Sequence, residues 1–407
     1  MTNIKKFITG KPLAWLLTLI YFTSYMTRKN FATVLQQVID ETGKAKDTLS
    51  IILVCMTVAY GVGQIINGRL GDKIKPTNLI FCGLIMATTI NFLFPFVSNS
   101  VVLMAILWGL NGFAQSMMWP PIVKILVTNC DDDMYSYSVV RVSWGSSFAT
   151  IVLYLIAPLI ITVSGTWKAL CFVSATIGLV MCISWFFLKR NINTVSPEEK
   201  SSTTKKAGFT IPRAAIFPII FIILGIIFQG MLRDGVATWM PTYLVEIHGL
   251  SNEKSIFSAV FPAIFSIATF SLANWLYQKF FTNEVVCGAV IFGVATLAAG
   301  TIFALFGMSS VVAVVCFTLI TGCMHGINLM LITHVPKRFK KYGNISTFAG
   351  IVNACTYVGE AIFLYGIAAL ASNFGWHFSI FTCFVIAILG TVCCIIAAAP
   401  WKKFSEQ

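Results

Sequence analysis

Long apolar runs alternate with short polar segments along nearly the whole chain. Most runs are about 20 residues long, the length that an α-helix needs to cross the hydrocarbon core of a bilayer. We therefore predict an all-α membrane protein with twelve transmembrane helices, which lie roughly at residues 12–36, 48–70, 76–97, 101–127, 135–163, 167–188, 214–246, 252–278, 285–306, 309–334, 345–371 and 376–399. In the fourth span, Trp119-Pro120-Pro121 predicts a break in the helix.

The composition excludes a soluble globular protein with a polar surface. Hydrophobic residues make up 57% of the 407 residues and charged residues 11%, and the mean hydropathy is +0.84. The 12 cysteines are scattered without a C-x-x-C pattern, so we interpret them as small packing residues. The sequence has no metal-ligand cluster, Ser/His/Asp arrangement or nucleotide-binding loop, so we expect no enzyme activity, metal or cofactor.

Membrane topology explains the formal net charge of +13. Alternate polar segments carry most of the 28 Lys and Arg residues, whereas the segments between them carry only Lys44, Lys46, Lys168 and Lys254. Basic residues accumulate on the cytoplasmic side of membrane proteins. We therefore expect a multi-pass protein of a cell (plasma or inner) membrane with both termini in the cytoplasm. Its partners would be the lipid bilayer and a small anion, without nucleic acid, and we expect a functional monomer.

A sequence repeat divides the chain into two halves. Arg28 and Arg233 both begin the pattern R-x-x-x-A-T and lie 205 residues apart. The segment GRLGDK at 68–73 has a degraded copy, NWLYQK, at 274–279. Internal repeats are typical of secondary transporters. We therefore expect two six-helix bundles, at residues 1–188 and 214–407, joined by a loosely ordered cytoplasmic linker at 189–213.

Ionisable residues inside the predicted spans favour an anion-binding site. An Arg at the centre of a membrane helix costs roughly 2.5–3.5 kcal/mol on insertion scales, so such residues are usually functional. On a helix, Tyr21, Tyr25 and Arg28 share one face. The charged residues within spans carry a net charge of +2 and are Arg28, Lys29, Arg141, Arg233, Asp234 and Glu360. A phosphate monoester has a charge near −2, and the planar fork of Arg matches its oxygens.

The segment at 68–73 resembles the cytoplasmic loop signature G-x-L-x-D-[RK] of the major facilitator superfamily. The resemblance implies that Gly68, Asp72 and Lys73 form a conformational latch. Small residues there let two helix ends approach, and Asp72 engages helix-end amides or a neighbouring cation. The alternative is a solvated turn with chance charges.

Within that superfamily the chain resembles the organophosphate:phosphate antiporters, which include glycerol-3-phosphate and hexose-phosphate transporters. The residues that carry the resemblance are Tyr21, Tyr25, Arg28–Phe31, Trp119–Pro121, Leu232, Arg233, Gly235, Trp239 and Pro241–Leu244. The resemblance implies that Arg28 and Arg233 bind phosphate from opposite sides. Residues 135–163 lack the histidine that glycerol-3-phosphate transporters use, and Glu360 replaces a small residue. These departures leave the organic group and the counter-ion open.

Each charged residue also has a structural interpretation. Arg28 is either a substrate ligand or the permanent partner of Glu360 or Asp234. An ion pair between Arg233 and the adjacent Asp234 is not expected, because neighbouring residues on an α-helix face different directions. Lys29 is either a site residue or a structural partner, and Arg141 either contacts substrate or pairs with Glu360. The lone His325 is more often a packed residue than a proton relay.

Three functions are compatible with these residues. The first is a secondary transporter that exchanges an organic phosphate ester for inorganic phosphate by alternating access. The second is a proton-coupled symporter of another organic anion, with Glu360 titrating. The third is a membrane sensor of sugar phosphate that binds its ligand with negligible flux. Counterflow into phosphate-loaded proteoliposomes distinguishes the first function from the other two.

Overall fold

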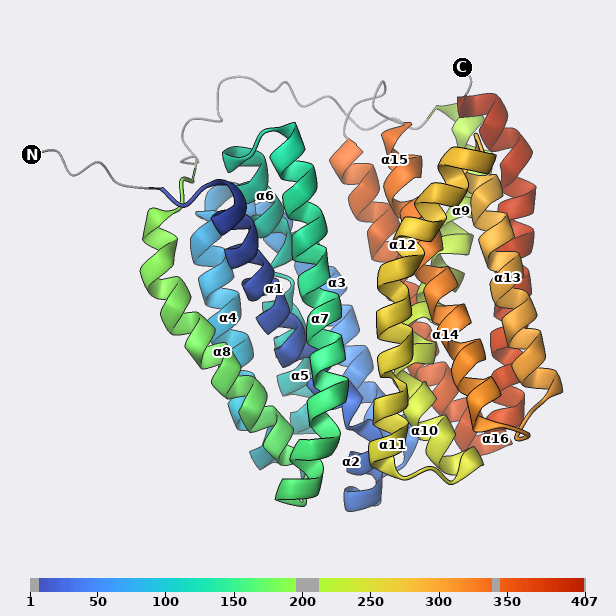
Figure 1. Ribbon diagram of the computed structural model, residues 1–407, viewed down its shortest axis with the longest axis horizontal. Helices are drawn as coiled ribbons and strands as arrows, with labels where there is room; N and C mark the ends of the chain where they lie inside the picture. Colours follow the sequence, from blue (N-terminus) through green and yellow to red (C-terminus); the bar gives the residue numbers. More distant parts are fainter. Residues whose placement is uncertain (1–6, 195–211, 339–344, 406–407) are drawn as a thin grey trace, which may run out of the picture. The chain divides into compact units, whose positions relative to one another are not determined.

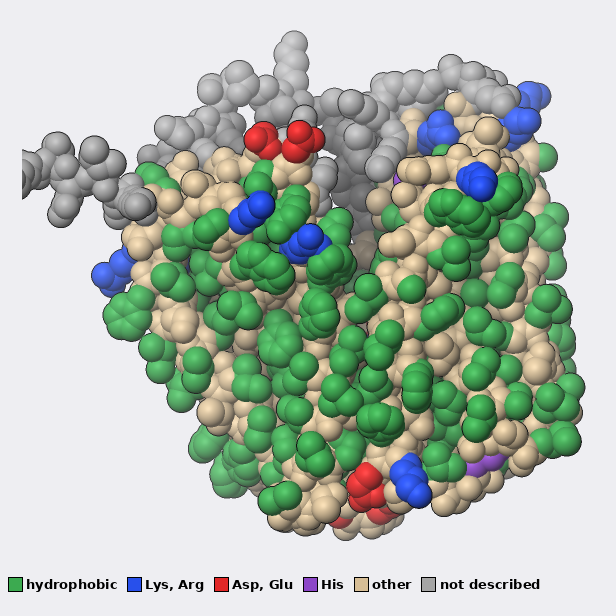
Figure 2. Space-filling model, in the orientation of Figure 1, with side chains coloured by type: hydrophobic (Ala, Val, Ile, Leu, Met, Phe, Trp, Pro, Cys, Tyr) green, Lys and Arg blue, Asp and Glu red, His purple; other side chains and the backbone are tan. Residues whose placement is uncertain are grey.

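The computed structural model describes residues 7–194, 212–338 and 345–405. Within these ranges every regular element is a helix (Figure 1). Ten segments there are long and apolar enough to cross a membrane. Hydrophobic side chains are spread over the visible face, and most of the charged ones lie toward its upper and lower parts (Figure 2). The chain is therefore an all-α membrane protein.

Two differences separate these ten segments from the twelve predicted spans. The helix α1 (Gly10–Thr33) is not among the ten, and it carries Lys11, Arg28 and Lys29. The helix α16 (Ile345–Ser405) counts once, although Gly375, with φ of 80°, breaks it into two arms. Since only glycine adopts such a positive φ without strain, Gly375 divides the two last predicted spans.

The chain divides into two compact units. The first consists of the described residues within Met1–Thr42 and Ile51–Lys205, and the second of those within Gly43–Ser50 and Lys206–Gln407. Most of the predicted linker, residues 195–211, lies outside the described residues. The predicted boundaries of the two bundles therefore stay a prediction.

The first unit begins with α1 and the short α2 (Leu35–Thr42). The remaining elements are α3 (Lys46–Lys73), α4 (Pro76–Leu93), η1 (Phe94–Val97), α5 (Val101–Gln115), α6 (Trp119–Asn129), α7 (Asp132–Ser164), α8 (Lys168–Leu188) and η2 (Lys189–Asn191). The first turn of α3 belongs to the second unit. The gap between α5 and α6 confirms the predicted break, because Pro120 lies in the first turn of α6. The segment at 68–73 continues α3 to Lys73, and the side chains of Gly68, Asp72 and Lys73 lie outside the description, so the latch stays a prediction.

The second unit contains two π-helical segments, η4 (Met231–Gly235) and η5 (Asn328–His334). Its other elements are α9 (Arg213–Gly230), α10 (Val236–His248), α11 (Asn252–Ser258), α12 (Val260–Phe280), α13 (Glu284–Ala304), α14 (Ser310–Ile327), α15 (Val335–Lys337) and α16. Segments with i→i+5 hydrogen bonds are rare in proteins and frequently lie at functional sites. The segment η4 contains Arg233.

The two units pack their helices in the same way. In the first unit α1 packs on α7, and α4 packs on α8. In the second unit α9 packs on the first arm of α16, and α13 also packs on α16. Each arginine-bearing helix therefore lies against a helix of its own unit, as a duplicated bundle requires.

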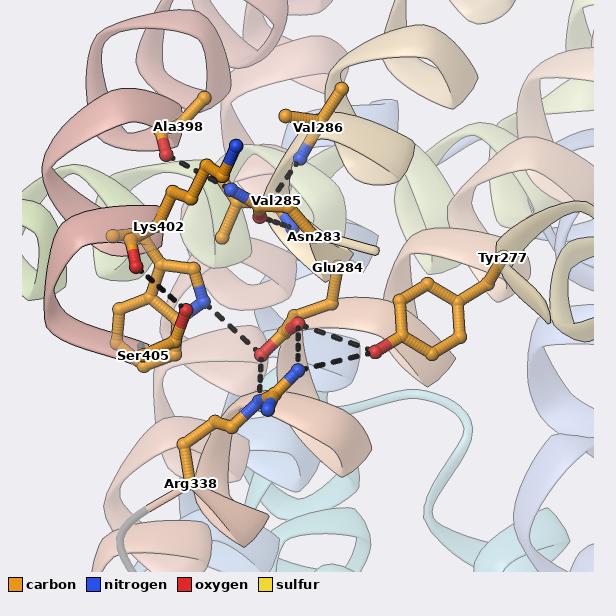
Figure 3. Close-up of polar contacts among 10 residues, drawn as sticks. Tyr277, Asn283, Glu284, Val285, Val286, Arg338, Ala398, Lys402 and Ser405 are labelled. Carbon is orange, nitrogen blue, oxygen red and sulfur yellow. Dashed lines mark hydrogen bonds and ion pairs between the residues drawn. The ribbon is translucent and has the colours of Figure 1, made fainter. Parts of the chain in front are cut away.

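A buried carboxylate joins four elements at one end of the second unit (Figure 3). Glu284, at the start of α13, accepts hydrogen bonds from Arg338 Nε at 3.1 Å and Nη2 at 3.2 Å. It also accepts from Trp401 Nε1 at 3.1 Å and from the Tyr277 hydroxyl at 3.4 Å. The hydrogen bond to Glu284 raises the pKa of Arg338. These four donors satisfy a charge that is otherwise costly to bury.

Candidate functional site

The guanidinium of Arg28 lies on aromatic faces in the interior of the first unit. Arg28 is only 6% exposed. Its Cζ lies 4.1 Å from the ring centroid of Tyr60 in α3 and 5.5 Å from that of Tyr25, one turn earlier in α1. A cation over a Tyr ring is attracted by the negative face of the ring and gains about 0.5–2 kcal/mol. A guanidinium carries its N–H donors along its edge, in a fork that matches the geometry of oxyanions.

Tyr21 and Tyr25 form an aromatic row with Trp119 on the same side of α1. The rings of Tyr21 and Tyr25 meet edge to face with centroids 5.1 Å apart, and Trp119 lies 5.2 Å from Tyr21. Trp119 begins α6, so the break after α5 brings its indole to α1. The predicted face of Tyr21, Tyr25 and Arg28 therefore exists as one aromatic and cationic surface.

A network of buried amide side chains holds α1 next to Arg28. Asn91 of α4 and Asn111 of α5 both donate to the backbone carbonyl of Thr27, at 2.8 and 2.9 Å. Gln115 donates to the Thr27 hydroxyl at 2.9 Å and accepts from Ser24 at 2.5 Å. The sequence analysis missed Tyr60, Asn91 and Asn111, and the only signal was the presence of polar residues in apolar runs.

In the second unit Arg233 forms an ion pair with its neighbour Asp234. Arg233 Nε donates to Asp234 Oδ2 at 2.7 Å, and Nη2 lies 2.5 Å from the same oxygen. The expectation that this pair would not form is therefore wrong. An i→i+5 helix has more residues per turn than an α-helix, so successive side chains diverge less, and the long Arg side chain folds back onto the carboxylate.

The first arm of α16 supplies two further groups near Arg233. Tyr357 and Glu360 both act electrostatically on the guanidinium, and Glu360 is 5% exposed. The approach of the helices depends on glycine: a Cβ at Gly230 would fall on the carbonyl oxygen of Thr356, and one at Gly359 on that of Ile227. Arg233, Asp234 and Glu360 thus form one cluster in the second unit, in which Glu360 is buried and the other two residues are partly buried.

The other predicted site residues lie at separate places. The Cζ of Arg141 in α7 lies 3.9 Å from the ring centroid of Trp144 and 4.7 Å from that of Tyr137. The Nε of Arg141 is buried and has no hydrogen-bond partner in the described part of the chain. Lys29 is half-buried beside Arg28 in α1. His325 Nδ1 lies 2.8 Å from the carbonyl oxygen of Thr321, one turn earlier, as a packed histidine would.

Each unit therefore presents its own arginine cluster, one built from Arg28 and tyrosines and one from Arg233 and carboxylates. The binding of a single phosphate by both arginines stays a prediction.

A comparison with known protein families identifies the class of this protein. Residues 17–351 match the family model for the Major Facilitator Superfamily. The chain belongs to this superfamily.

Relatives of this superfamily member include transporters of small phosphate esters. The chain is 26% identical over 389 residues to a protein named glycerol-3-phosphate transporter from Bacillus subtilis, covering 88% of this chain and 85% of the relative. It is 23% identical over 411 residues to the phosphoglycerate transporter protein of Salmonella typhimurium, covering 92% and 85%. A bacterial homologue of the lysosomal transporter Spinster, in an inward-facing and occupied conformation, matches with a TM-score of 0.75 at 12% identity over 96% of this chain and 97% of that chain. The last match shows the fold, and the family together with the named relatives indicates a transporter and not an enzyme.

Proposed function

We propose that the chain is a secondary active transporter that exchanges an organic phosphate ester for inorganic phosphate across a cell membrane. The observation that carries the proposal is the placement of Arg28 and Arg233 at matching positions of a duplicated membrane protein, both inside helices. The names of relatives that cover most of the chain support phosphate esters as substrates.

Charge and geometry support phosphate as the common group of both substrates. A guanidinium binds two phosphate oxygens through parallel N–H donors, and such charge-assisted bonds are about twice as strong as neutral ones. Arg28 would bind the phosphate through its N–H donors while its plane stays against the tyrosine rings. The hydroxyls of Tyr21 and Tyr25 would add hydrogen bonds to the phosphate. Lys29 and Arg141 would add positive charge along the path of the substrate.

Arg233 requires a change of partner. Asp234 occupies its guanidinium at 2.5–2.7 Å, so a phosphate that binds Arg233 displaces an internal carboxylate. Without substrate, closure of the two bundles would desolvate Arg28 at a cost, whereas a bound dianion offsets this cost. Because the movement of the bundles then depends on a bound substrate, exchange is favoured over uniport.

Counterflow tests the proposal. Purified protein in phosphate-loaded liposomes should take up radiolabelled glycerol-3-phosphate or hexose phosphate when phosphate is inside, and much less when it is absent. The variant Arg28→Lys keeps the charge but loses the two-point contact, so its initial rate should fall by at least about tenfold. The matched control is Arg213→Lys, which changes an exposed arginine at the start of α9. A normal rate for Arg28→Lys would contradict the assignment.

One observation favours a second candidate, proton-coupled symport of an organic anion. The cluster of the second unit holds two carboxylates, Asp234 and Glu360, for the single guanidinium of Arg233. If one of these carboxylates binds a transported proton, uptake into empty liposomes should follow an imposed pH gradient. Glu360→Gln should then abolish that dependence, whereas phosphate exchange would leave uptake independent of the gradient.

A further inference from the structure

The backbone carbonyl of Thr27 is held by two amide side chains from two other helices. Asn91 Nδ2 lies 2.8 Å from this oxygen and Asn111 Nδ2 lies 2.9 Å from it. Both donors therefore converge on one carbonyl of α1. Thr27 directly precedes Arg28, and the position of its carbonyl therefore fixes the point from which the arginine side chain leaves α1.

The surrounding side chains extend this contact into a network. Asn30 donates to Asn91 Oδ1 at 2.7 Å, and Asn91 also donates to the carbonyl of Ala87 at 2.9 Å. Asn30, Asn91 and Asn111 are all fully buried. A buried polar network is stabilising and specific only when its members are satisfied, and it defines one arrangement of the helices around it. Apolar side chains in the same space would not need hydrogen-bond partners and would not specify one arrangement of the helices.

A corresponding contact lies at the same register in the second unit. Ser24 lies one turn before Arg28 and donates to Gln115, at the end of α5. Gln229 lies one turn before Arg233, 205 residues after Ser24, and donates to the carbonyl of Met324 in α14 at 3.0 Å. Both side chains are buried. Each arginine helix is thus tied by a polar side chain to another helix of its unit, just before the arginine.

We infer that Asn91 and Asn111 are positioning residues for Arg28. They act through the Thr27 carbonyl and set the height and direction of the guanidinium over Tyr60. A ligand held by two parallel hydrogen bonds is sensitive to this setting, because a misplacement of about 1 Å can cost about 100-fold in activity. The inference rests on the proposed function for its ligand, phosphate, but not for the placement of Arg28.

The test combines single variants with a double-mutant cycle. Asn91→Leu and Asn111→Leu each remove one donor to the Thr27 carbonyl. The hydrogen bond from the other asparagine remains and still supports folding. The control is Asn67→Leu, because Asn67 is equally buried but donates to Ser116 Oγ at 2.6 Å and not to the Thr27 carbonyl. Each variant is measured for phosphate affinity by isothermal titration and for thermal stability in detergent. Each is also combined with Arg28→Lys.

A positioning role predicts an about tenfold weaker phosphate affinity for Asn91→Leu or Asn111→Leu and an unchanged affinity for Asn67→Leu. In the Arg28→Lys background the same substitutions should cause no further loss of affinity, because they act through the arginine. Losses that add in that background, or an equal loss in Asn67→Leu, would show that the asparagines act only on stability and would overturn the inference.

A ligand-free measurement separates this inference from the proposed function. In protein labelled with ¹⁵N-arginine, the Nε–H resonance of Arg28 is identified by its loss in Arg28→Lys. It should shift or broaden in Asn91→Leu and Asn111→Leu and stay in place in Asn67→Leu. If the wild-type chain binds no phosphate, the proposed function fails, yet this resonance still decides the positioning role. An unmoved resonance in both asparagine variants would refute that role.

Discussion

At the scale of single residues, the two units stabilise their guanidinium groups by different means. Arg28 lies over the rings of Tyr25 and Tyr60, whereas Arg233 is bonded to the carboxylate of Asp234. The plane of the Arg28 guanidinium lies against the ring of Tyr60, whereas the carboxylate of Asp234 binds the in-plane N–H donors of Arg233. An entering anion therefore competes with an internal carboxylate at Arg233.

Asp234→Asn should increase the affinity for phosphate. The substitution removes the charge that competes with the ligand for Arg233 and keeps the size of the side chain. We expect the Kd for phosphate to fall by about three- to tenfold, corresponding to a coupling of about 1 kcal/mol. Isothermal titration measures this change, and Asp133→Asn, at an exposed position of α7, is the control. An affinity that is unchanged or weaker would mean that Asp234 does not compete with the ligand.

At the scale of helices, close backbone contact joins α9 and η4 to the first arm of α16. The contact is possible because Gly230 and Gly359 lack a Cβ where the helices cross. Arg233 and Glu360 lie in the same region, on the two crossing elements. The crossing therefore holds the cluster of the second unit in one arrangement.

Gly359→Ala should destabilise the second unit. The added methyl group would overlap the carbonyl oxygen of Ile227, which belongs to the backbone and cannot turn aside. Overpacking of this kind costs about 1–3 kcal/mol. Gly366→Ala, in the same helix, is a matched control because no atom lies within 4 Å of its added Cβ. Thermal unfolding in detergent should show a lower Tm for Gly359→Ala alone, and equal Tm values would exclude the tight crossing.

Glu284→Gln should loosen one end of the second unit. The amide group would direct N–H donors toward Arg338, Trp401 or Tyr277, which are themselves donors, and would leave part of the cluster unsatisfied. A buried unsatisfied group costs about 1–3 kcal/mol. We expect a Tm several degrees lower, measured by the same unfolding assay. A Tm equal to that of the wild type would indicate that water satisfies the cluster.

At the scale of the whole molecule, the distribution of basic residues predicts the orientation in the membrane. Fusion of green fluorescent protein after Gln407 should give fluorescent cells, because this protein folds only on the cytoplasmic side. Alkaline phosphatase fused after Lys44 should be active, since that loop is expected on the opposite side. The reverse pattern of signals would refute the orientation.

Much of the architecture could be predicted from sequence because hydrophobic length and helix breakers act locally. The apolar runs gave the helices, and the prolines after Trp119 gave the break before α6. The contacts of Tyr60, Asn91 and Asn111 with α1 depend on how helices pack, which no local pattern records. The Arg233–Asp234 pair was predicted wrongly, because the prediction assumed α-helical geometry, whereas Arg233 and Asp234 lie in the π-helical segment η4, which packs against α16.

The donors around Glu284 also set a limit for protein engineering. The indole of Trp401 completes the cluster, and Phe404 beside it is 2% exposed, so the final turns of α16 are structural. A truncated form that stops at Pro400 would take away one donor and open the carboxylate to lipid headgroups or water. Affinity tags and crystallisation partners therefore belong after Ser405, and shortened expression forms should keep the chain through that residue.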